Sequence, residues 1–177
     1  MEIITCEMDA QTLQDVDRCG NTFTVDSQLV LSAENGKISY TVVPVPPREK
    51  SYPPEPKDYR AYLNAPDKVI FFAYADGELA GQIRILKWWN AYAYIDDIAA
   101  EPRFRKHGVG RALLLRAVDW ASSKGFPGVM LETQNINVPA CRLYQSCGFE
   151  LGGFDRNLYK GLNPSTDEIA LYWYLIF

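Results

Sequence analysis

The sequence is poor in the residues that build metal sites and membrane spans. It has a single histidine, and its four cysteines, at positions 6, 19, 141 and 147, include no CxxC pair. Zinc sites need several such ligands at short spacing, so we expect no metal site. No run approaches the roughly 18 apolar residues of a membrane span, and the N-terminal segment is acidic where a secretory signal is apolar. We therefore expect a cytosolic protein with reduced thiols and no membrane partner.

An excess of positive charge is also missing. The net charge of −4 argues against non-specific nucleic-acid binding and is compatible with a cationic partner. The 177 residues, 47% of them apolar, are enough for one domain with a buried core. We expect a single domain over residues 1–177 and no nucleic-acid partner.

The first half of the sequence predicts strands joined by tight turns. Residues 28–45 alternate apolar and polar positions around Asn35-Gly36, which predicts strands or a hairpin. Residues 45–59 hold five of the eleven prolines and predict an irregular connection across the surface, which could also be part of a lid over an acceptor. Residues 69–86 predict a second hairpin turning at Asp76-Gly77, and residues 91–100 a third strand.

Helices and strands alternate in the second half. Apolar residues recur at helical spacing from Val109, and Gly125 stands where a helix C-cap belongs, so a helix is predicted over about 108–124. A buried strand at 129–134 precedes a helix that is capped by Asn137 and ends at Gly148. Two closing strands are predicted at 149–159 and 169–177, the second buried on both faces. This order indicates a mixed α/β fold with helices packed on a sheet.

The stretch RKHGVG, from Arg105 to Gly110, stands between the third strand and the first helix. A helix N-terminus offers backbone N–H groups and the positive end of its dipole, and glycines let a phosphate approach, so pyrophosphate is the natural ligand. A nucleoside-triphosphate loop is excluded because Arg111-Ala112 stands where Lys-Ser/Thr is needed. A dinucleotide fingerprint is excluded because Leu113 stands where a small residue belongs.

The remaining pattern, Arg-x-x-Gly-x-Gly after a strand, resembles the acetyl-CoA loop of the GNAT superfamily of N-acetyltransferases. The stretch LETQNINVPACRLYQSCGF, residues 131–149, resembles the other half of the same signature. With WNAYAYIDDIA and the terminal WYLIF, residues 69–177 resemble the streptothricin (nourseothricin) acetyltransferases of that superfamily. The resemblance implies a mostly antiparallel, twisted central sheet that is splayed at the strand pair holding acetyl-CoA, with helices on both faces. The acetyl-CoA-binding and catalytic core would span residues 69–160.

By this resemblance, the chain is an acetyl-CoA-dependent N-acetyltransferase that acetylates a primary amine of a streptothricin-type antibiotic and so gives resistance. The partners implied are acetyl-CoA and a cationic amine, and the resemblance also allows a homodimer. Two alternatives remain open. The acceptor could be a peptide or protein amine, such as a ribosomal-protein N-terminus, or the chain could be a non-catalytic coenzyme A-binding module.

The resemblance also implies roles for individual residues. The backbone of Ile98, Ala99 and Ala100 would hold the pantetheine arm and polarise the thioester carbonyl, with Asn137 and Ala140 as further cofactor contacts. Tyr144 would protonate the departing thiolate. The pyrophosphate would lie on the loop formed by Arg105, Lys106, His107, Gly108, Val109, Gly110 and Arg111.

The general base is open among Glu132, Asp96 and Asp97. Glu132 is the first choice, acting directly or through a water, because it matches a base position of the ribosomal-protein branch. All three carboxylates could instead bind a polycationic substrate. Structural alternatives are an ion pair of Glu132 with Arg103 or Arg105, a solvated strand edge at Asp96-Asp97, and core packing of Tyr144 beside Leu143 and Phe149.

Overall fold

The computed structural model describes residues 1–52 and 57–177, and the chain divides into two compact units. Unit 1 comprises Met1–Asn21, Tyr52–Val129 and Ile176–Phe177, and unit 2 comprises Thr22–Ser51 and Met130–Leu175. Each unit therefore combines segments that are far apart in the sequence. Residues 53–56, which belong to the predicted connection or lid, lie outside the described residues.

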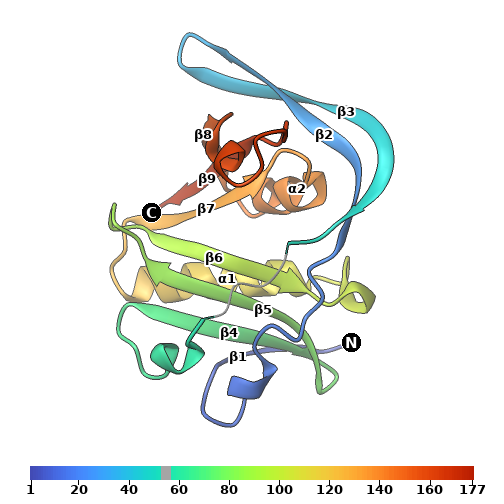
Figure 1. The fold of residues 1–177 in the computed structure, drawn as a ribbon. Coiled ribbons are helices and arrows are strands. Elements are labelled where there is room, and N and C mark those ends of the chain that lie inside the picture. The colour runs from blue at the N-terminus through green and yellow to red at the C-terminus, as the bar shows by residue number, and fades with distance from the viewer. Residues whose placement is uncertain (53–56) are drawn as a thin grey trace. The chain divides into compact units, whose positions relative to one another are not determined.

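Unit 1 contains four strands in the order β1 (Ile3–Glu7), β4 (Lys68–Ala75), β5 (Glu78–Lys87) and β6 (Ala93–Ala100), shown in Figure 1. Each neighbouring pair is antiparallel. The predicted hairpin is confirmed, because Asp76 and Gly77 have φ angles of 48° and 85°, which suit a two-residue turn with both residues left-handed. Strand β1 had no counterpart in the sequence-based prediction.

Helix α1 (Val109–Ser123) packs on this sheet, as Figure 1 shows. It buries one apolar face formed by Val109, Leu113, Leu114, Ala117, Trp120 and Ala121. The approach is close at Gly81 in β5, where an added Cβ would lie 2.8 Å from both the Ala99 carbonyl oxygen and Val109 Cγ1. Gly125, with φ of 75°, follows the helix end as predicted.

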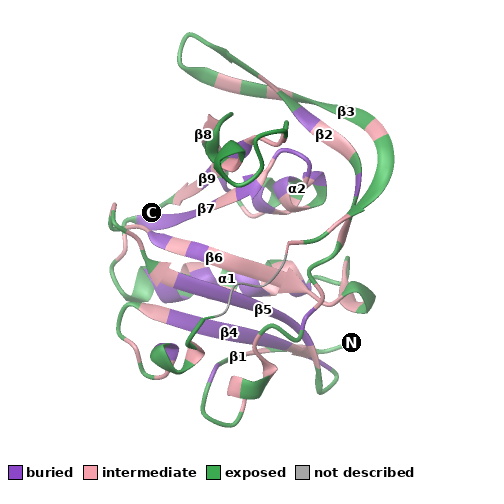
Figure 2. Cartoon of the chain, viewed as in Figure 1, coloured by how far each residue is buried: buried purple, intermediate pink, exposed green. Residues whose placement is uncertain are grey.

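The core of unit 1 lies along β4 and β5, which are coloured as buried over most of their length in Figure 2. Phe71, Phe72, Ile83 and Ile85 are each 0% exposed. Burial of a side chain of this size contributes roughly 1.5–3 kcal/mol. The described part of the unit also contains short 3-10 turns at Leu13–Asp15 (η1), Tyr59–Tyr62 (η2) and Pro102–Phe104 (η3).

Unit 2 begins with a long hairpin of β2 (Phe23–Glu34) and β3 (Lys37–Lys50) that turns at Asn35-Gly36, as predicted. The prediction of an irregular connection from residue 45 is wrong, because β3 continues through Pro46 and Pro47 to Lys50. The pairing shifts register here, from Ser27↔Pro44 to Val25↔Arg48. Prolines that donate no backbone hydrogen bond are tolerated at such an irregularity and in a two-stranded sheet.

The remainder of unit 2 contains β7 (Gly128–Gln134), α2 (Val138–Ser146), β8 (Glu150–Asp155) and β9 (Ala170–Ile176), with β9 between β7 and β8. The strand predicted over 149–159 ends earlier, because residues Leu158–Gly161 form a 3-10 turn (η4). The prediction that the last strand is buried on both faces is also wrong. Leu171 and Trp173 are buried, but Tyr172 and Tyr174 on the other face are only half-buried, and Ile176 is 60% exposed.

Asn135, at the end of β7, ties three segments of unit 2 together. Its backbone carbonyl accepts from Leu29 N at 2.9 Å, and its Nδ2 donates to the Leu29 carbonyl at 3.2 Å. Its backbone N–H donates to the Ile169 carbonyl and its Oδ1 accepts from Ile169 N, both at 2.9 Å. Asn135 is only 4% exposed, and these bonds satisfy its buried polar groups. They also hold the β2–β3 hairpin against the end of β7.

The mixed α/β class with mostly antiparallel pairs agrees with the prediction. No helix in the described part of the chain is long and apolar enough to cross a membrane. Within residues 1–52 and 57–177, no three or more His, Cys, Asp or Glu side chains are grouped so that they could hold a metal ion.

Candidate active site

In unit 1, a β-bulge brings the two adjacent aspartates of β6 to one cluster. The register with β5 runs from Arg84↔Asp97 to Ile85↔Ile95, so Asp96 is the extra residue. In a regular strand, successive side chains point to opposite faces, and a bulge changes this alternation. Arg84 Nε accordingly donates to Asp96 Oδ2 at 3.2 Å, while Gln82 Nε2 donates to Asp97 Oδ2 at 2.7 Å.

Asp17 joins this cluster from the N-terminal segment. Its backbone N–H donates to Gln82 Oε1 at 2.7 Å, and its Oδ1 accepts from Gln82 Nε2 at 2.9 Å and from Arg84 Nη1 at 3.1 Å. The Tyr59 hydroxyl donates to Asp17 Oδ2 and accepts from Arg84 Nη1. Lys57 Nζ lies 2.6 Å from Asp96 Oδ2. Among the described residues, three carboxylates (Asp17, Asp96 and Asp97) therefore lie in one cluster with two cations (Arg84 and Lys57).

Burial shapes the electrostatics of this cluster. Desolvation raises the pKa of Asp97, against the opposing effects of Arg84 and of the Gln82 hydrogen bond. Desolvation opposes the charge of Arg84, but the combined effect of Asp97, Asp96, Tyr59 and Asp17 outweighs it and raises the pKa of the guanidinium. The reading of Asp96-Asp97 as a solvated strand edge is therefore wrong. A half-buried group of this kind suits the binding of an ammonium ion.

The predicted pyrophosphate loop has the backbone geometry of an anion site. Lys106 and Gly108 have φ angles of 64° and 93°, and no side chain of the described residues caps the start of α1. Lys106, His107 and Arg111 are exposed. Arg105 serves the fold instead, because its guanidinium donates to the carbonyls of Ala100 at 2.9 Å and Gly20 at 3.1 Å. Ile98, Ala99 and Ala100 are half-buried and pair with β5 through Ile83, Gln82 and Gly81.

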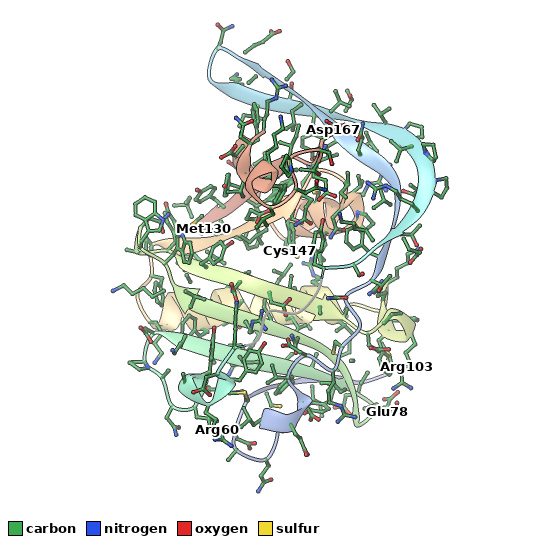
Figure 3. The ribbon with its side chains drawn as sticks, viewed as in Figure 1. Arg60, Glu78, Arg103, Met130, Cys147 and Asp167 are labelled. Carbon is green, nitrogen blue, oxygen red and sulfur yellow. The ribbon has the colours of Figure 1, made fainter. Side chains whose placement is uncertain are left out.

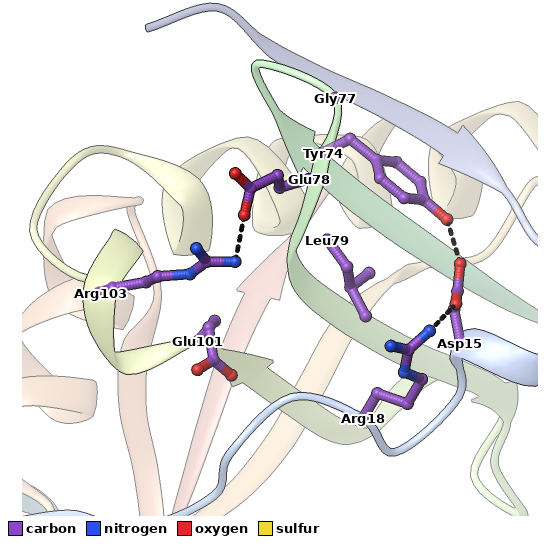
Figure 4. A pocket seen from close by; sticks show the side chains of 8 residues that line it. All are labelled: Asp15, Arg18, Tyr74, Gly77, Glu78, Leu79, Glu101 and Arg103. Atoms are coloured by element: carbon purple, nitrogen blue, oxygen red, sulfur yellow. Dashed lines mark hydrogen bonds and ion pairs between the residues drawn. The ribbon is translucent and has the colours of Figure 1, made fainter.

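A separate hollow of about 430 Å³ lies at the turn between β4 and β5 (Figure 4). Two ion pairs line it: Arg103 with Glu78, and Arg18 with Asp15, whose carboxylate also accepts from the Tyr74 hydroxyl. The carboxylate of Glu101, which also lines it, accepts from Gly20 N at 3.1 Å. Figure 3 labels Arg103 and Glu78 next to one another at this turn. None of the predicted site residues lines it.

In unit 2, Glu132 lies on β7 and accepts a hydrogen bond from the Tyr159 hydroxyl of η4. Burial raises the pKa of Glu132 to about 7. A carboxylate with that pKa is partly ionised at neutral pH and can accept a proton from an amine. The predicted alternative was an ion pair of Glu132 with Arg103 or Arg105. Arg103 instead pairs with Glu78, and Arg105 donates to backbone carbonyls.

Tyr144 is 4% exposed, and its ring centroid lies 6.2 Å from those of both Phe149 and Trp173. The predicted packing against Phe149 is therefore present, and it holds the ring in place. Asn137 caps α2 by accepting from Ala140 N at 3.4 Å, as predicted. Cys147, labelled in Figure 3, follows the helix as its C-cap residue.

The GNAT family model matches residues 39–149. The chain belongs to the acetyltransferase (GNAT) family. It is 37% identical to streptothricin acetyltransferase A of Bacillus subtilis (strain 168) over 93% of its own length and 95% of the relative's. A crystal structure of a candidate streptothricin acetyltransferase from Bacillus anthracis, in complex with acetyl coenzyme A, has a TM-score of 0.91 at 42% identity, covering 100% of this chain and 98% of that one. A nourseothricin acetyltransferase structure has a TM-score of 0.80 at 32% identity, covering 98% of both. The predicted GNAT fold and acetyltransferase class are confirmed.

Several residues that contact the predicted site residues in each unit were missed by sequence reasoning. Gln82 and Arg84 could have been found, because two long polar residues two positions apart in the apolar run of β5 signal a buried polar cluster. Asp17 and Tyr59 gave no signal, since they come from segments without a recognisable pattern. Tyr159 was hidden by the prediction of a strand where the chain forms η4.

Proposed function

We propose that this chain transfers the acetyl group of acetyl-CoA to a primary amine of a streptothricin-type antibiotic and thereby gives resistance. The observation that carries the proposal is the similarity over nearly the whole chain to acetyltransferases named for that substrate. The negatively charged residues in both units add support, because a streptothricin carries several positive charges.

The residues of unit 1 fit a cofactor with a pyrophosphate. The space beside Gly108 is open, because an added Cβ would meet only Ile3 Cδ1, at 3.8 Å. We assign the pyrophosphate to the backbone from Lys106 to Arg111, with exposed cations beside it. The backbone of residues 98–100 is assigned to the pantetheine arm. Acetyl-CoA, when bound, supplies the activated acetyl group.

The remaining residues are assigned to the acceptor and to proton transfer. Asp96 and Asp97 bind cationic groups of the acceptor. Glu132 takes the proton of the attacking ammonium group, directly or through a water, because its raised pKa suits that transfer. Tyr144 donates the proton to the departing thiolate, and Asn137 and Ala140 contact the pantetheine. The amine attacks the thioester directly while both substrates are bound.

The proposal treats residues 1–177 as a single acetyltransferase domain with its core at 69–160. We place it in the cytosol, because none of the four cysteines, all among the described residues, forms a disulfide. Formation of a homodimer stays a prediction.

The proposal can be tested by the release of coenzyme A thiol from acetyl-CoA, with and without streptothricin. We expect saturable turnover that requires the antibiotic, and kcat reduced by about 10² or more in Tyr144→Phe and Glu132→Gln. Tyr40→Phe is the matched control, because that hydroxyl bonds the exposed Gln145 in the same unit. A sensitive host expressing the wild type should tolerate more streptothricin.

The alternatives give different outcomes in the same assay. Turnover with peptide N-termini but not with streptothricin would replace the acceptor and keep the chemistry. Binding of acetyl-CoA without turnover on either acceptor would indicate a non-catalytic coenzyme A-binding module and overturn the proposal.

A further inference from the structure

We infer that Tyr159 is a positioning residue for Glu132: its hydroxyl holds the carboxylate in place and sets the pH range over which Glu132 accepts a proton. The inference rests on the proposed function, in which Glu132 is the base.

The contact joins a strand to a turn of the same unit. The Tyr159 hydroxyl donates to Oε1 of Glu132, and both side chains are half-buried. A carboxylate held through one oxygen keeps a defined orientation, which leaves Oε2 as the atom that takes the proton. Orientation of this kind matters because proton transfer requires hydrogen-bond distance and alignment.

The turn that presents Tyr159 is built by its own hydrogen bonds. Asp155 Oδ1 accepts from Asn157 N at 2.7 Å and from Leu158 N at 3.1 Å, which starts η4. The Tyr159 carbonyl accepts from Leu162 N at 3.0 Å and from Asn163 N at 2.9 Å. Asp155 is itself fixed, because it is paired with Ala170 of β9. The position of the tyrosine is thus determined on both sides.

Glu132 lies close enough to Tyr172 of β9 to affect its ionisation. Tyr172 has a raised pKa, because of burial first and then the charges of Glu132, Asp155 and the Tyr174 side chain. For Glu132 itself, burial is the cause of the raised pKa, so burial favours its protonated form. A hydrogen bond donated to the carboxylate favours its ionised form. Tyr159 therefore opposes burial and keeps Glu132 ionised to lower pH.

The direct test is the titration of Glu132, followed by NMR of ¹³C-labelled glutamate carboxyls, with Glu132→Gln to assign the signal. In Tyr159→Phe we expect the pKa of Glu132 to rise by about one unit. The control Tyr40→Phe removes a tyrosine hydroxyl of the same unit and should leave the titration unchanged. An unchanged titration in Tyr159→Phe would overturn the inference.

A second test uses the pH dependence of kcat/KM with streptothricin. Tyr159→Phe should move the acid limb to higher pH by the same amount. Asp155→Ala and Asp155→Asn both remove the charge of Asp155, but only asparagine keeps an oxygen that accepts from Asn157 and Leu158. The acid limb of Asp155→Ala should therefore lie at higher pH than that of Asp155→Asn. A uniform fall in activity with the limb unmoved would mean a structural role only. If the wild type acetylates no amine, the proposed function fails, while the titration still decides the role of Tyr159.

Discussion

Arg84 Nε on β5 donates a hydrogen bond to Asp96 Oδ2 on β6 at 3.2 Å. The guanidinium side chain is only 10% exposed and also donates to Asp17. One buried cation therefore holds together two segments of unit 1 that lie far apart in the sequence. Loss of the Arg84 guanidinium would leave half-buried carboxylates with one cation fewer to balance their negative charge.

Replacement of this cation should destabilise unit 1. For Arg84→Met we expect the free energy of unfolding to fall by about 3 kcal/mol, because buried charges lose their partner. The control is Arg18→Met, which removes an ion pair whose arginine is 64% exposed and should change stability by less than about 1 kcal/mol. Urea denaturation measures both, and equal losses would contradict the assignment.

The raised pKa of Glu132 predicts a pH-dependent effect of Glu132→Gln. A carboxyl whose pKa rises from 4.5 to about 7 on folding stabilises the protein fully below pH 4.5, and this contribution is lost as the pH rises through 7. Because glutamine does not titrate, this decrease of stability with rising pH is absent in Glu132→Gln. Its stability relative to wild type should thus be greater at pH 8 than at pH 5, by at most roughly 3 kcal/mol. Glu150→Gln removes an exposed charge of the same unit and should differ from wild type by less than about 0.5 kcal/mol at both pH values. A difference independent of pH for Glu132→Gln would refute the raised pKa.

The close approach of α1 to β5 predicts a cost for any side chain at position 81. In Gly81→Ala the new Cβ would lie 2.8 Å from the Ala99 carbonyl oxygen, which is backbone and cannot rotate away. We expect the free energy of unfolding to fall by about 2 kcal/mol. In Gly161→Ala the new Cβ meets nothing within 4 Å, so thermal denaturation should hardly distinguish it from wild type.

Substitution of Gly108 should weaken cofactor binding in addition to straining the backbone. Gly108→Ala places a side chain at φ of 93° in the assigned pyrophosphate loop, and we expect the Kd for acetyl-CoA to rise about tenfold, or 1.4 kcal/mol. Gly77→Ala introduces comparable strain at φ of 85°, in the turn between β4 and β5. Calorimetric titration should give that control the wild-type Kd. The same Kd in both variants would place the pyrophosphate elsewhere.

The sequence predicted the elements whose signals are local. Turn residues located the hairpins at Asn35-Gly36 and Asp76-Gly77, and Asn137 located the start of α2, because each acts through its own backbone geometry. Pro46 and Pro47 led to the wrong prediction. A proline destabilises a strand only where the neighbouring strand would accept a hydrogen bond from the N–H that proline lacks. That pairing is not a local property.

The candidate site was predicted only in part for the same reason. The motif residues Glu132, Asn137 and Tyr144 could be named from their order along the chain. The partners that set their environment, Tyr159 and Trp173, come from segments brought close by folding. The bulge at Asp96 also depends on the register with β5, which two adjacent aspartates do not reveal.

The anchoring of the β2–β3 hairpin by Asn135 has a consequence for synthesis of the protein. Leu29 leaves the ribosome 106 residues before the asparagine that binds it, and Ile169 follows later still. Contacts so distant in sequence form slowly, because a long loop must close first. Strands β4 to β6 and α1 are complete by Ser123, so unit 1 is expected to fold while Leu29 of the hairpin still lacks its hydrogen bonds to Asn135. The nascent chain is therefore most exposed to aggregation in the interval between the emergence of Lys50 and that of β9.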